Sequence, residues 1–193
     1  MNEQTLTRRA FLTVGGCAVA GCAAALGADV PAEAVIDIHQ HTNYSGRTDA
    51  QLLAHQRAMG ITHTILLPSG TPMNIASTHQ GRSNGLAAQC GGNETVAAMA
   101  AAHPGEFFFG ANEVPDLPEA RREIEAWLKK GAKIIAEQKF SVECDGPHVQ
   151  ALAELARDHD VPMLMHFQVG QYNLGFERFH RMLEKYPTVR FIG

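Results

Sequence analysis

From residue 35 onward, short apolar runs rich in β-branched residues alternate with segments of helical periodicity. The apolar runs lie at 35–41, 61–67, 106–112, 133–140, 161–167 and 188–192. The helical patterns lie at 48–59, 93–102, 118–130, 147–159 and 175–185, and Asn93 is predicted to cap the second of these helices. Strands that alternate with helices at this spacing form a parallel sheet with crossover helices. The pattern therefore predicts an α/β fold, either an open doubly wound sheet or a large part of an eight-stranded barrel.

The end of the first apolar run favours the barrel. A nucleotide-binding open sheet carries a glycine-rich fingerprint after its first strand, whereas this run ends in His-Gln-His at residues 39–41. In a barrel the chemistry lies at the C-terminal ends of the strands, which is where these histidines fall. We therefore predict an incomplete (β/α)8 TIM barrel, with about six of its eight strands present.

Three histidines at strand ends predict a metal site. Side chains two residues apart project to the same face of a strand, so His39 and His41 share a face with Asp37. The fifth run, VPMLMHF, ends at His166, which opens on the same rim. Three neutral imidazoles can bind zinc or a similar divalent ion and leave a position open for water. The alternative is three unrelated polar strand ends, and the shared rim favours the metal site.

Four segments carry a family resemblance. IDIHQHT, GAKIIAEQKF, VPMLMHF and YPTVRFIG resemble the first, fourth, fifth and sixth strand regions of the amidohydrolase superfamily, in its single-metal, amidohydrolase-related branch. The resemblance implies that His39, His41 and His166 bind one divalent metal ion, with zinc preferred and manganese as the alternative. It also implies a hydrolase that activates a metal-bound water against a small carbonyl-containing or cyclic substrate. Decarboxylation by the same kind of site is the alternative reaction.

The family pattern extends beyond this sequence. In the family a histidine follows the sixth strand, and an aspartate after the eighth strand binds metal and handles a proton. The sequence stops at Gly193, immediately before the expected histidine. We therefore expect residues 31–193 to be the N-terminal portion of a metal-dependent hydrolase barrel, inactive alone, with its catalytic carboxylate beyond residue 193. The alternative from another class is a non-catalytic exported lipoprotein remnant.

Further polar side chains are candidates for substrate contact. Glu137 and Lys139 share a face of the fourth strand near its C-terminal end, and they either contact substrate or pair with each other. Arg47 follows the first strand and could bind a substrate carboxylate through two hydrogen bonds. Tyr44 lies in the same loop, and His79 lies in a long polar loop that could reach the site.

The opening HQHTNYSG is also similar to the first motif of PHP phosphoesterases, His-x-His-Thr-x-Tyr-Ser followed by Gly. In that family the second strand ends in a Thr-Asp-His-like group. Here the second apolar run ends in LLPSG instead. A PHP-type phosphoesterase is therefore a distant alternative.

Residues 1–30 read as an export signal and linker. TRRAFL at residues 7–12 matches the twin-arginine signal and precedes a charge-free stretch of small and apolar residues. VAGC, ending at Cys22, matches the lipoprotein processing box and predicts acylation of that cysteine; ordinary cleavage near residues 25–28 is the alternative. We therefore expect export by the twin-arginine route to the periplasm or cell envelope, with a lipid anchor in the membrane if Cys22 is acylated.

The composition narrows the choice of partners. Lys and Arg number 16 against 20 acidic residues, which gives a net charge of -4, and no nucleic-acid-binding motif occurs. We therefore expect a small-molecule substrate and no nucleic acid, while the oligomeric state does not follow from the sequence. The chain has 4 cysteines. Cys90 and Cys144 could pair outside the cytoplasm, but one bond does not make a disulfide scaffold.

Overall fold

The computed structural model describes residues 33–69 and 90–193. The export signal, Cys22 and His79 lie outside the described residues, so the predictions made for them stay predictions. Residues 34–193 belong to a single compact unit. Within the ranges given above, no helix is long and apolar enough to cross a membrane.

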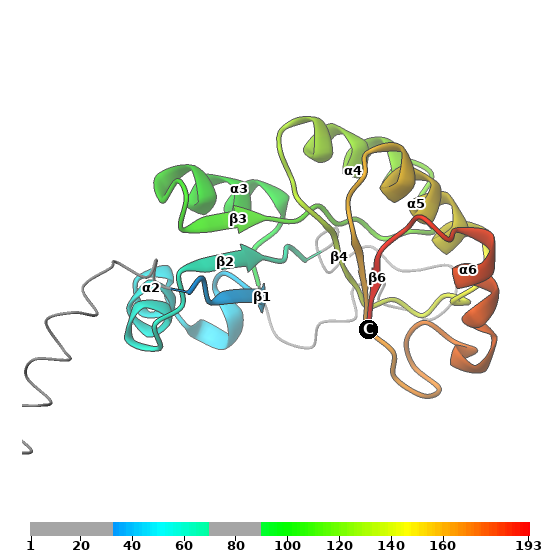
Figure 1. The fold of residues 1–193 in the computed structure, drawn as a ribbon, viewed down its shortest axis with the longest axis horizontal. Helices are drawn as coiled ribbons and strands as arrows, with labels where there is room; N and C mark the ends of the chain where they lie inside the picture. Colours follow the sequence, from blue (N-terminus) through cyan, green and yellow to red (C-terminus); the bar gives the residue numbers. More distant parts are fainter. Residues whose placement is uncertain (1–32, 70–89) are drawn as a thin grey trace, which may run out of the picture. The chain divides into compact units, whose positions relative to one another are not determined.

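The strands of the described part are short and parallel. They are β1 Ile36–Gln40, β2 His63–Leu66, β3 Phe107–Phe109, β4 Ile135–Gln138, β5 Met163–Met165 and β6 Phe191–Ile192. Their orders are β1-β2-β3 and β4-β5-β6 in two three-stranded sheets. Ala111, just after β3, bridges in parallel to Ile135, and its N–H donates to the Ile134 carbonyl at 2.8 Å. The strands therefore follow one another in chain order as a single parallel series (Figure 1).

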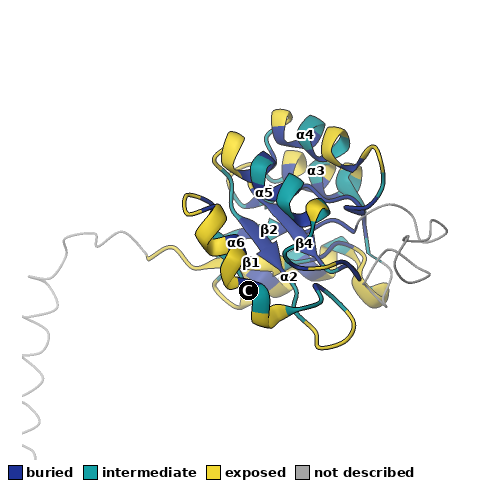
Figure 2. Ribbon diagram, turned by 90° about the vertical axis from the view of Figure 1, so that its right-hand side faces the viewer, coloured by how far each residue is buried: buried dark blue, intermediate teal, exposed yellow. Residues whose placement is uncertain are grey.

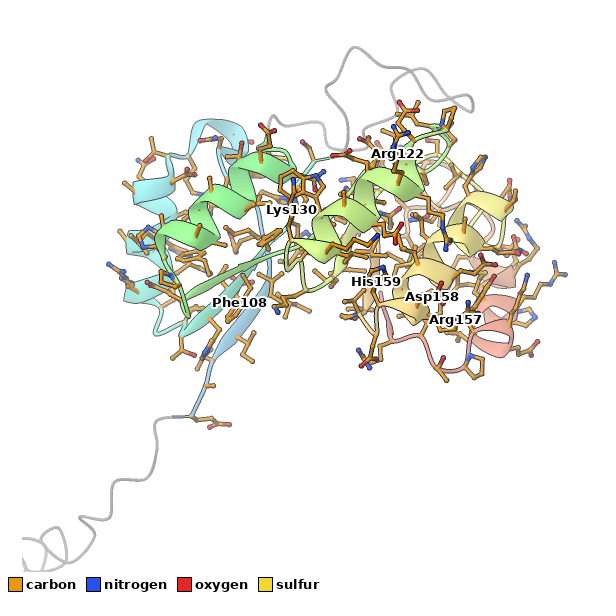
Figure 3. The ribbon with its side chains drawn as sticks, turned by 90° about the horizontal axis from the view of Figure 1, so that it is seen from above. Phe108, Arg122, Lys130, Arg157, Asp158 and His159 are labelled. Atoms are coloured by element: carbon orange, nitrogen blue, oxygen red, sulfur yellow. The ribbon has the colours of Figure 1, made fainter. Side chains whose placement is uncertain are left out.

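Helices connect the strands and cover them from outside. They are α2 Asp49–Ala58, α3 Asn93–Ala102, α4 Ala120–Lys129, α5 Pro147–Asp158 and α6 His180–Lys185, with 3-10 helices η1 Tyr44–Gly46 and η2 Phe176–Arg178. Figure 2 shows the buried strands beneath helices whose outer faces are exposed. The labelled side chains of Lys130, Arg157 and Asp158 lie on this helical layer in Figure 3. The predicted α/β alternation is confirmed.

Local sequence explains where the helices begin. At α2, the Thr48 hydroxyl accepts a hydrogen bond from the Gln51 N–H at 3.2 Å, and the Gln51 side chain accepts one from the Thr48 N–H at 2.9 Å. This capping box satisfies two N–H groups that the helix cannot pair internally. Helix α5 begins at Pro147, whose fixed φ and missing N–H suit the first helical position.

Three apolar clusters hold the strands and helices together. The largest joins α4 and α5 to β4 and β5, and Ile124, Leu152 and Met163 within it are at most 1% exposed. A second cluster packs α2 and α3 against β2 and β3. A third joins side chains from the middle strands, namely Leu67, Ile134, Ala136 and Leu164. The helices thus fix the spacing of the strands and, with it, the spacing of the strand ends.

Several predicted boundaries were wrong in detail. Asn93 was predicted to cap α3, but Gly92 holds that position and Asn93 is the first helical residue. Helix α4 begins at Ala120, after a turn that contains Pro118. The predicted helix at 175–185 is divided at Phe179 into η2 and α6. Each strand is shorter than the apolar run that predicted it. The runs are longer because residues in the connecting turns are buried too, as at 67–69.

The two described cysteines do not form a disulfide. Cys90 is partly buried and Cys144 is buried, and both are free thiols. Burial, together with the nearby Asp145 carboxylate, raises the pKa of the Cys144 thiol to about 11. Its Sγ donates to the Gly175 carbonyl at 3.0 Å, so Cys144 behaves as a structural thiol.

A pair of leucine substitutions tests the position of the main core. Leu152→Ala should destabilise the protein by about 2–5 kcal/mol, because a fully buried leucine leaves a cavity that the packed helices close only in part. Leu183→Ala removes the same atoms from a side chain that is 51% exposed, and it should cost less than about 1 kcal/mol. Urea unfolding followed by circular dichroism measures both. Equal losses would contradict the placement of the core between α5 and the sheet.

Candidate metal centre

Glu137, in β4, is the residue around which the site is built. Its Oε2 lies 3.2 Å from His39 Nε2 and 3.5 Å from His41 Nε2. Its Oε1 lies 2.7 Å from His166 Nδ1. His39 lies in β1, His41 directly after it, and His166 directly after β5. The structure thus brings the three predicted histidines together at the C-terminal strand ends, with a carboxylate between them.

The donor atoms of this cluster suit a divalent ion. One ligand atom from each of His39, His41 and Glu137 lies within 4.8 Å of the other two. Donors that bind one zinc ion at 2.0–2.2 Å in a tetrahedron lie about 3.4 Å apart. Two imidazoles and one carboxylate form a set typical of catalytic zinc sites, which leave a further position open. The residues therefore fit the metal that the sequence predicts.

His166 has a different relation to the cluster. It is outside the set of donors that lie within 4.8 Å of one another, which comprises His39, His41 and Glu137 among the described residues. Its Nδ1 contacts Oε1 of Glu137, whereas His39 and His41 contact Oε2. The predicted ligand set of three histidines therefore stays a prediction, and the structure adds Glu137 to the candidates.

Hydrogen bonds orient the His41 ring. Its Nδ1 lies 2.8 Å from the Leu67 carbonyl. Because a carbonyl oxygen only accepts, Nδ1 carries the proton, which leaves Nε2 as the nitrogen that faces Glu137 and can bind an ion. The ring of Tyr44 stacks on His41 with centroids 5.4 Å apart. The loop after β1 and the turn after β2 together hold this imidazole.

Arg47 acts on the end of β1. Its Nη2 donates to the His41 carbonyl at 2.8 Å and to Gln40 Oε1 at 3.1 Å. These two bonds tie the loop to the strand that carries the histidines. The proposed contact of Arg47 with a substrate carboxylate stays a prediction, and so does substrate contact by Tyr44.

The electrostatics of the pair formed by His41 and Glu137 are strongly perturbed. Burial lowers the pKa of His41, but hydrogen bonds to Cys90, Glu137 and the Leu67 carbonyl outweigh it and raise this pKa to about 9. Burial likewise raises the pKa of Glu137, yet the hydrogen bonds and charges of His39 and His41 hold it far below its usual range. Without metal, the site thus holds a carboxylate beside an imidazolium at neutral pH. A metal ion would replace the proton on His41.

Lys139 does not pair with Glu137. Its Nζ lies 5.4 Å from the centroid of the Tyr172 ring, and Tyr172 contacts the His166 ring edge-on at 5.9 Å between centroids. Within the described ranges, the ion pairs of Glu137 are with histidines. The interpretation of Glu137 and Lys139 as a mutual ion pair is therefore wrong. Lys139 instead places a cation beside the rim of the site.

A cavity of about 350 Å³ is lined mainly by the segment between β5 and α6. Aromatic rings of Phe167, Tyr172 and Phe176 line it. Tyr172 is shared, because it lines the cavity and contacts His166. The cavity thus shares the Tyr172 side chain with the surroundings of His166.

Some features of the site escaped the sequence reasoning. The pairing of β1 with β2 shifts register between Asp37 and Gln40. Asp37, expected on the face of the two histidines, instead accepts hydrogen bonds from Gln40 and Gln56, each at 2.8 Å. The central place of Glu137 was also missed. The available signal was its position near the end of the fourth strand, on the same rim as the histidines.

Comparison with known proteins identifies the family. The amidohydrolase family model matches residues 36–193. The chain belongs to the amidohydrolase family. No curated protein matches the chain significantly.

Solved structures confirm the fold of the chain. An uncharacterised TIM-barrel protein from Bordetella bronchiseptica is 15% identical, with a TM-score of 0.55 over 82% of this chain and 66% of that one. A putative amidohydrolase from Staphylococcus aureus is also 15% identical, with a TM-score of 0.53 over the same shares. A 2,6-dihydroxybenzoate decarboxylase is 14% identical, with a TM-score of 0.50 over 80% of this chain and 55% of that one. The chain thus spans less than two thirds of these structures, and its six parallel strands match part of a TIM barrel.

The paired titration of His41 and Glu137 predicts how stability depends on pH without metal. The pKa of His41 rises from 6.5 to about 9 on folding. Its contribution is therefore complete below pH 6.5 and is lost as the pH rises to 9. In EDTA, stability should fall by about 2–3 kcal/mol between pH 6.5 and 9, as measured by urea unfolding.

The controls for this pH dependence are two glutamate substitutions. Glu137→Gln should flatten the decline, because His41 loses its carboxylate partner. Glu106→Gln, which removes the partly buried partner of Arg57, should leave the decline unchanged. A wild-type stability that is constant or rises over this range would contradict the assignment of an imidazolium at His41.

Proposed function

We propose that the protein is a metal-dependent hydrolase that uses one divalent ion, preferably zinc, at the C-terminal ends of β1 and β4. The observation that carries this proposal is the convergence of His39, His41 and Glu137 within 4.8 Å in a chain of the amidohydrolase family. His39 and His41 are common to both candidate ligand sets. His166 completes the set predicted from the sequence, and Glu137 completes the set that the structure brings together.

The proposed ion would lower the pKa of a water molecule and polarise a carbonyl oxygen of the substrate. The negative charge of the Glu137 carboxylate would stabilise this ion. Its strongly lowered pKa keeps the carboxylate ionised at neutral pH, whereas a general acid works best with a pKa near the working pH. Glu137 is therefore assigned to charge balance and ligation, and not to proton donation.

His39 provides the open side of the site. Its side chain is 44% exposed, whereas those of His41 and Glu137 are 9% and 3% exposed. A substrate would approach from the side of His39, while the buried pair holds the geometry. In this proposal the exposed imidazole of His39 lies at the entrance, and the buried Glu137 carboxylate and His41 imidazole lie behind it.

We propose a small carboxylated or cyclic molecule as the substrate. Lys139 supports this choice because its cation lies beside Tyr172 at the rim, where it can attract an anionic group. The cavity next to Tyr172 is large enough for a small ring and is lined by aromatic side chains. Arg47 and Tyr44 remain further candidates for substrate contact in the loop after β1.

Export by the twin-arginine route and a lipid anchor at Cys22 remain part of the proposal. Their support is the sequence of residues 1–30. A folded metalloprotein suits that route because the ion can bind before the chain crosses the membrane.

Zinc titration tests the ligand sets. The wild-type chain should bind about one Zn²⁺, as measured by isothermal titration calorimetry on protein stripped with EDTA. His39→Ala and His41→Ala should each weaken binding by more than about 100-fold, because even residues that only hold ligands in place contribute 10–100-fold. His55→Ala, on the exposed face of α2, is the matched control and should bind as the wild type does.

The same titration separates the two candidate sets. A large loss in Glu137→Gln with a small loss in His166→Ala assigns Glu137 as the third ligand. The reverse result assigns His166. Wild-type affinity in both His39→Ala and His41→Ala would contradict the metal site.

A reaction assay distinguishes hydrolysis from decarboxylation. The zinc-loaded protein, with any residues that follow Gly193 included, is incubated with a panel of small lactones, amides and aromatic carboxylates, and acid release and CO2 release are followed separately. We expect turnover of a lactone or amide with loss of that turnover in Glu137→Gln. Release of CO2 alone would assign the decarboxylase alternative. Zinc binding without any turnover across the panel would favour a protein that binds but does not catalyse.

A further inference from the structure

A buried network of carboxamide side chains contacts the backbone of the site residues. Asn112, which follows β3 after Gly110 and Ala111, is 2% exposed, and Gln138 in β4 is 1% exposed. Asn112 Nδ2 donates to the Glu137 carbonyl at 3.0 Å and to the Pro68 carbonyl at 3.2 Å. Gln138 Nε2 donates to Asn112 Oδ1 at 2.7 Å. One side chain thus links the ends of β2, β3 and β4.

The network continues to β5 through Asn173. This residue is 2% exposed, and its Nδ2 donates to the His166 carbonyl at 2.9 Å and also to the Gln138 carbonyl. The backbone carbonyls of Glu137 and His166 therefore each accept a hydrogen bond from a buried carboxamide. Both of these residues belong to the candidate metal centre.

The backbone of Asn112 is itself fixed. Asn93, the first residue of α3, accepts from the Asn112 N–H at 3.0 Å and donates to the Asn112 carbonyl at 2.8 Å. This explains why the Asn93 side chain does not cap its own helix. Asn112 is therefore held on both sides, by α3 through its backbone and by β2 and β4 through its side chain.

Regular strand pairing does not supply the same support at Glu137. The pairing of β4 with β5 shifts register between Ile135 and Gln138. The Glu137 carbonyl lies within this irregular stretch and receives bonds from Asn112 Nδ2 and from the Lys139 N–H at 3.0 Å. The Lys139 bond is local, whereas the Asn112 bond comes from another part of the chain. Asn112 therefore fixes the Glu137 backbone relative to the end of β3, and with it the direction in which residue 137 presents its side chain.

We infer that Asn112 is a positioning residue for Glu137 and that it sets the affinity of the site for metal. The inference rests on the proposed function. Asn112 touches neither the donor atoms nor a substrate, and it acts by holding the backbone from which the Glu137 carboxylate projects. A carboxamide is required because this side chain donates two hydrogen bonds and accepts one.

Asn112→Asp tests the inference with nearly the same shape. The change places a carboxylate oxygen against two backbone carbonyls, so the support of Glu137 is lost. We expect one bound ion per chain with a Zn²⁺ Kd weakened by about 10–100-fold, and a shift of the visible absorption bands of the Co²⁺-loaded protein. These bands report the geometry of coordination, which a loss of stability elsewhere does not alter. Ile124→Val, in the core of α4, is the control and should leave both the Kd and the bands unchanged.

A second variant keeps the test decisive if the aspartate prevents folding. Asn112→Ser keeps one donor and should show a smaller shift of Kd in the same direction. Wild-type Kd and Co²⁺ bands in either folded variant would overturn the inference. Failure of both variants to fold would also overturn it, because Asn112 would then act on the fold and not on the site. A wild-type chain that binds no Zn²⁺ would instead overturn the proposed function, on which the inference rests.

Discussion

The burial of the Glu137 carboxylate is the constraint on which the site depends. A charged group removed from water is strongly destabilising unless nearby opposite charges and hydrogen bonds replace its hydration. Here that replacement comes from three imidazoles on two other strand ends. The carboxylate cannot stay ionised unless β1, β4 and β5 bring their ends together. The ionised carboxylate of the centre therefore depends on the same arrangement of strand ends that defines the fold.

Two kinds of contact bring the strand ends together: apolar packing between helices and strands, and hydrogen bonds at the strand ends. The apolar clusters between helices and strands fix the spacing of the strands without any specific polar contact. At the strand ends, side-chain amides and backbone carbonyls provide directional contacts where regular pairing is interrupted. Burial thus sets the approximate position of each strand end, and hydrogen bonds set the precise position of each side chain of the candidate site. This division follows from the physics, because hydrophobic contacts have no preferred direction whereas hydrogen bonds do.

The sequence predicted the fold better than it predicted the site. Alternating apolar runs and helical patterns indicate which residues are buried, and the pattern of burial determines the fold class. The parallel α/β series could therefore be predicted from the sequence. His39, His41 and His166 were readable because each sits at the end of such a run. The role of Glu137 was not predicted, since the register shifts in the pairing of β1 with β2 and of β4 with β5 leave no signal in the sequence. Long-range contacts such as that of Asn93 with Asn112 leave no local signal, and Asn93 was therefore interpreted as a helix cap.

The unequal exposure of the two histidines from the first strand has a consequence for the kinetics of metal exchange. His39 is largely open to water, while His41 is held by the Leu67 carbonyl and the Tyr44 ring. The proposed ion would meet the exposed His39 imidazole before any buried group had moved. Departure would reverse this order, with a competing chelator taking the place of His39 first. Loading and stripping of the ion would then share one route, and the mobility of a single exposed ring would set the rate of both.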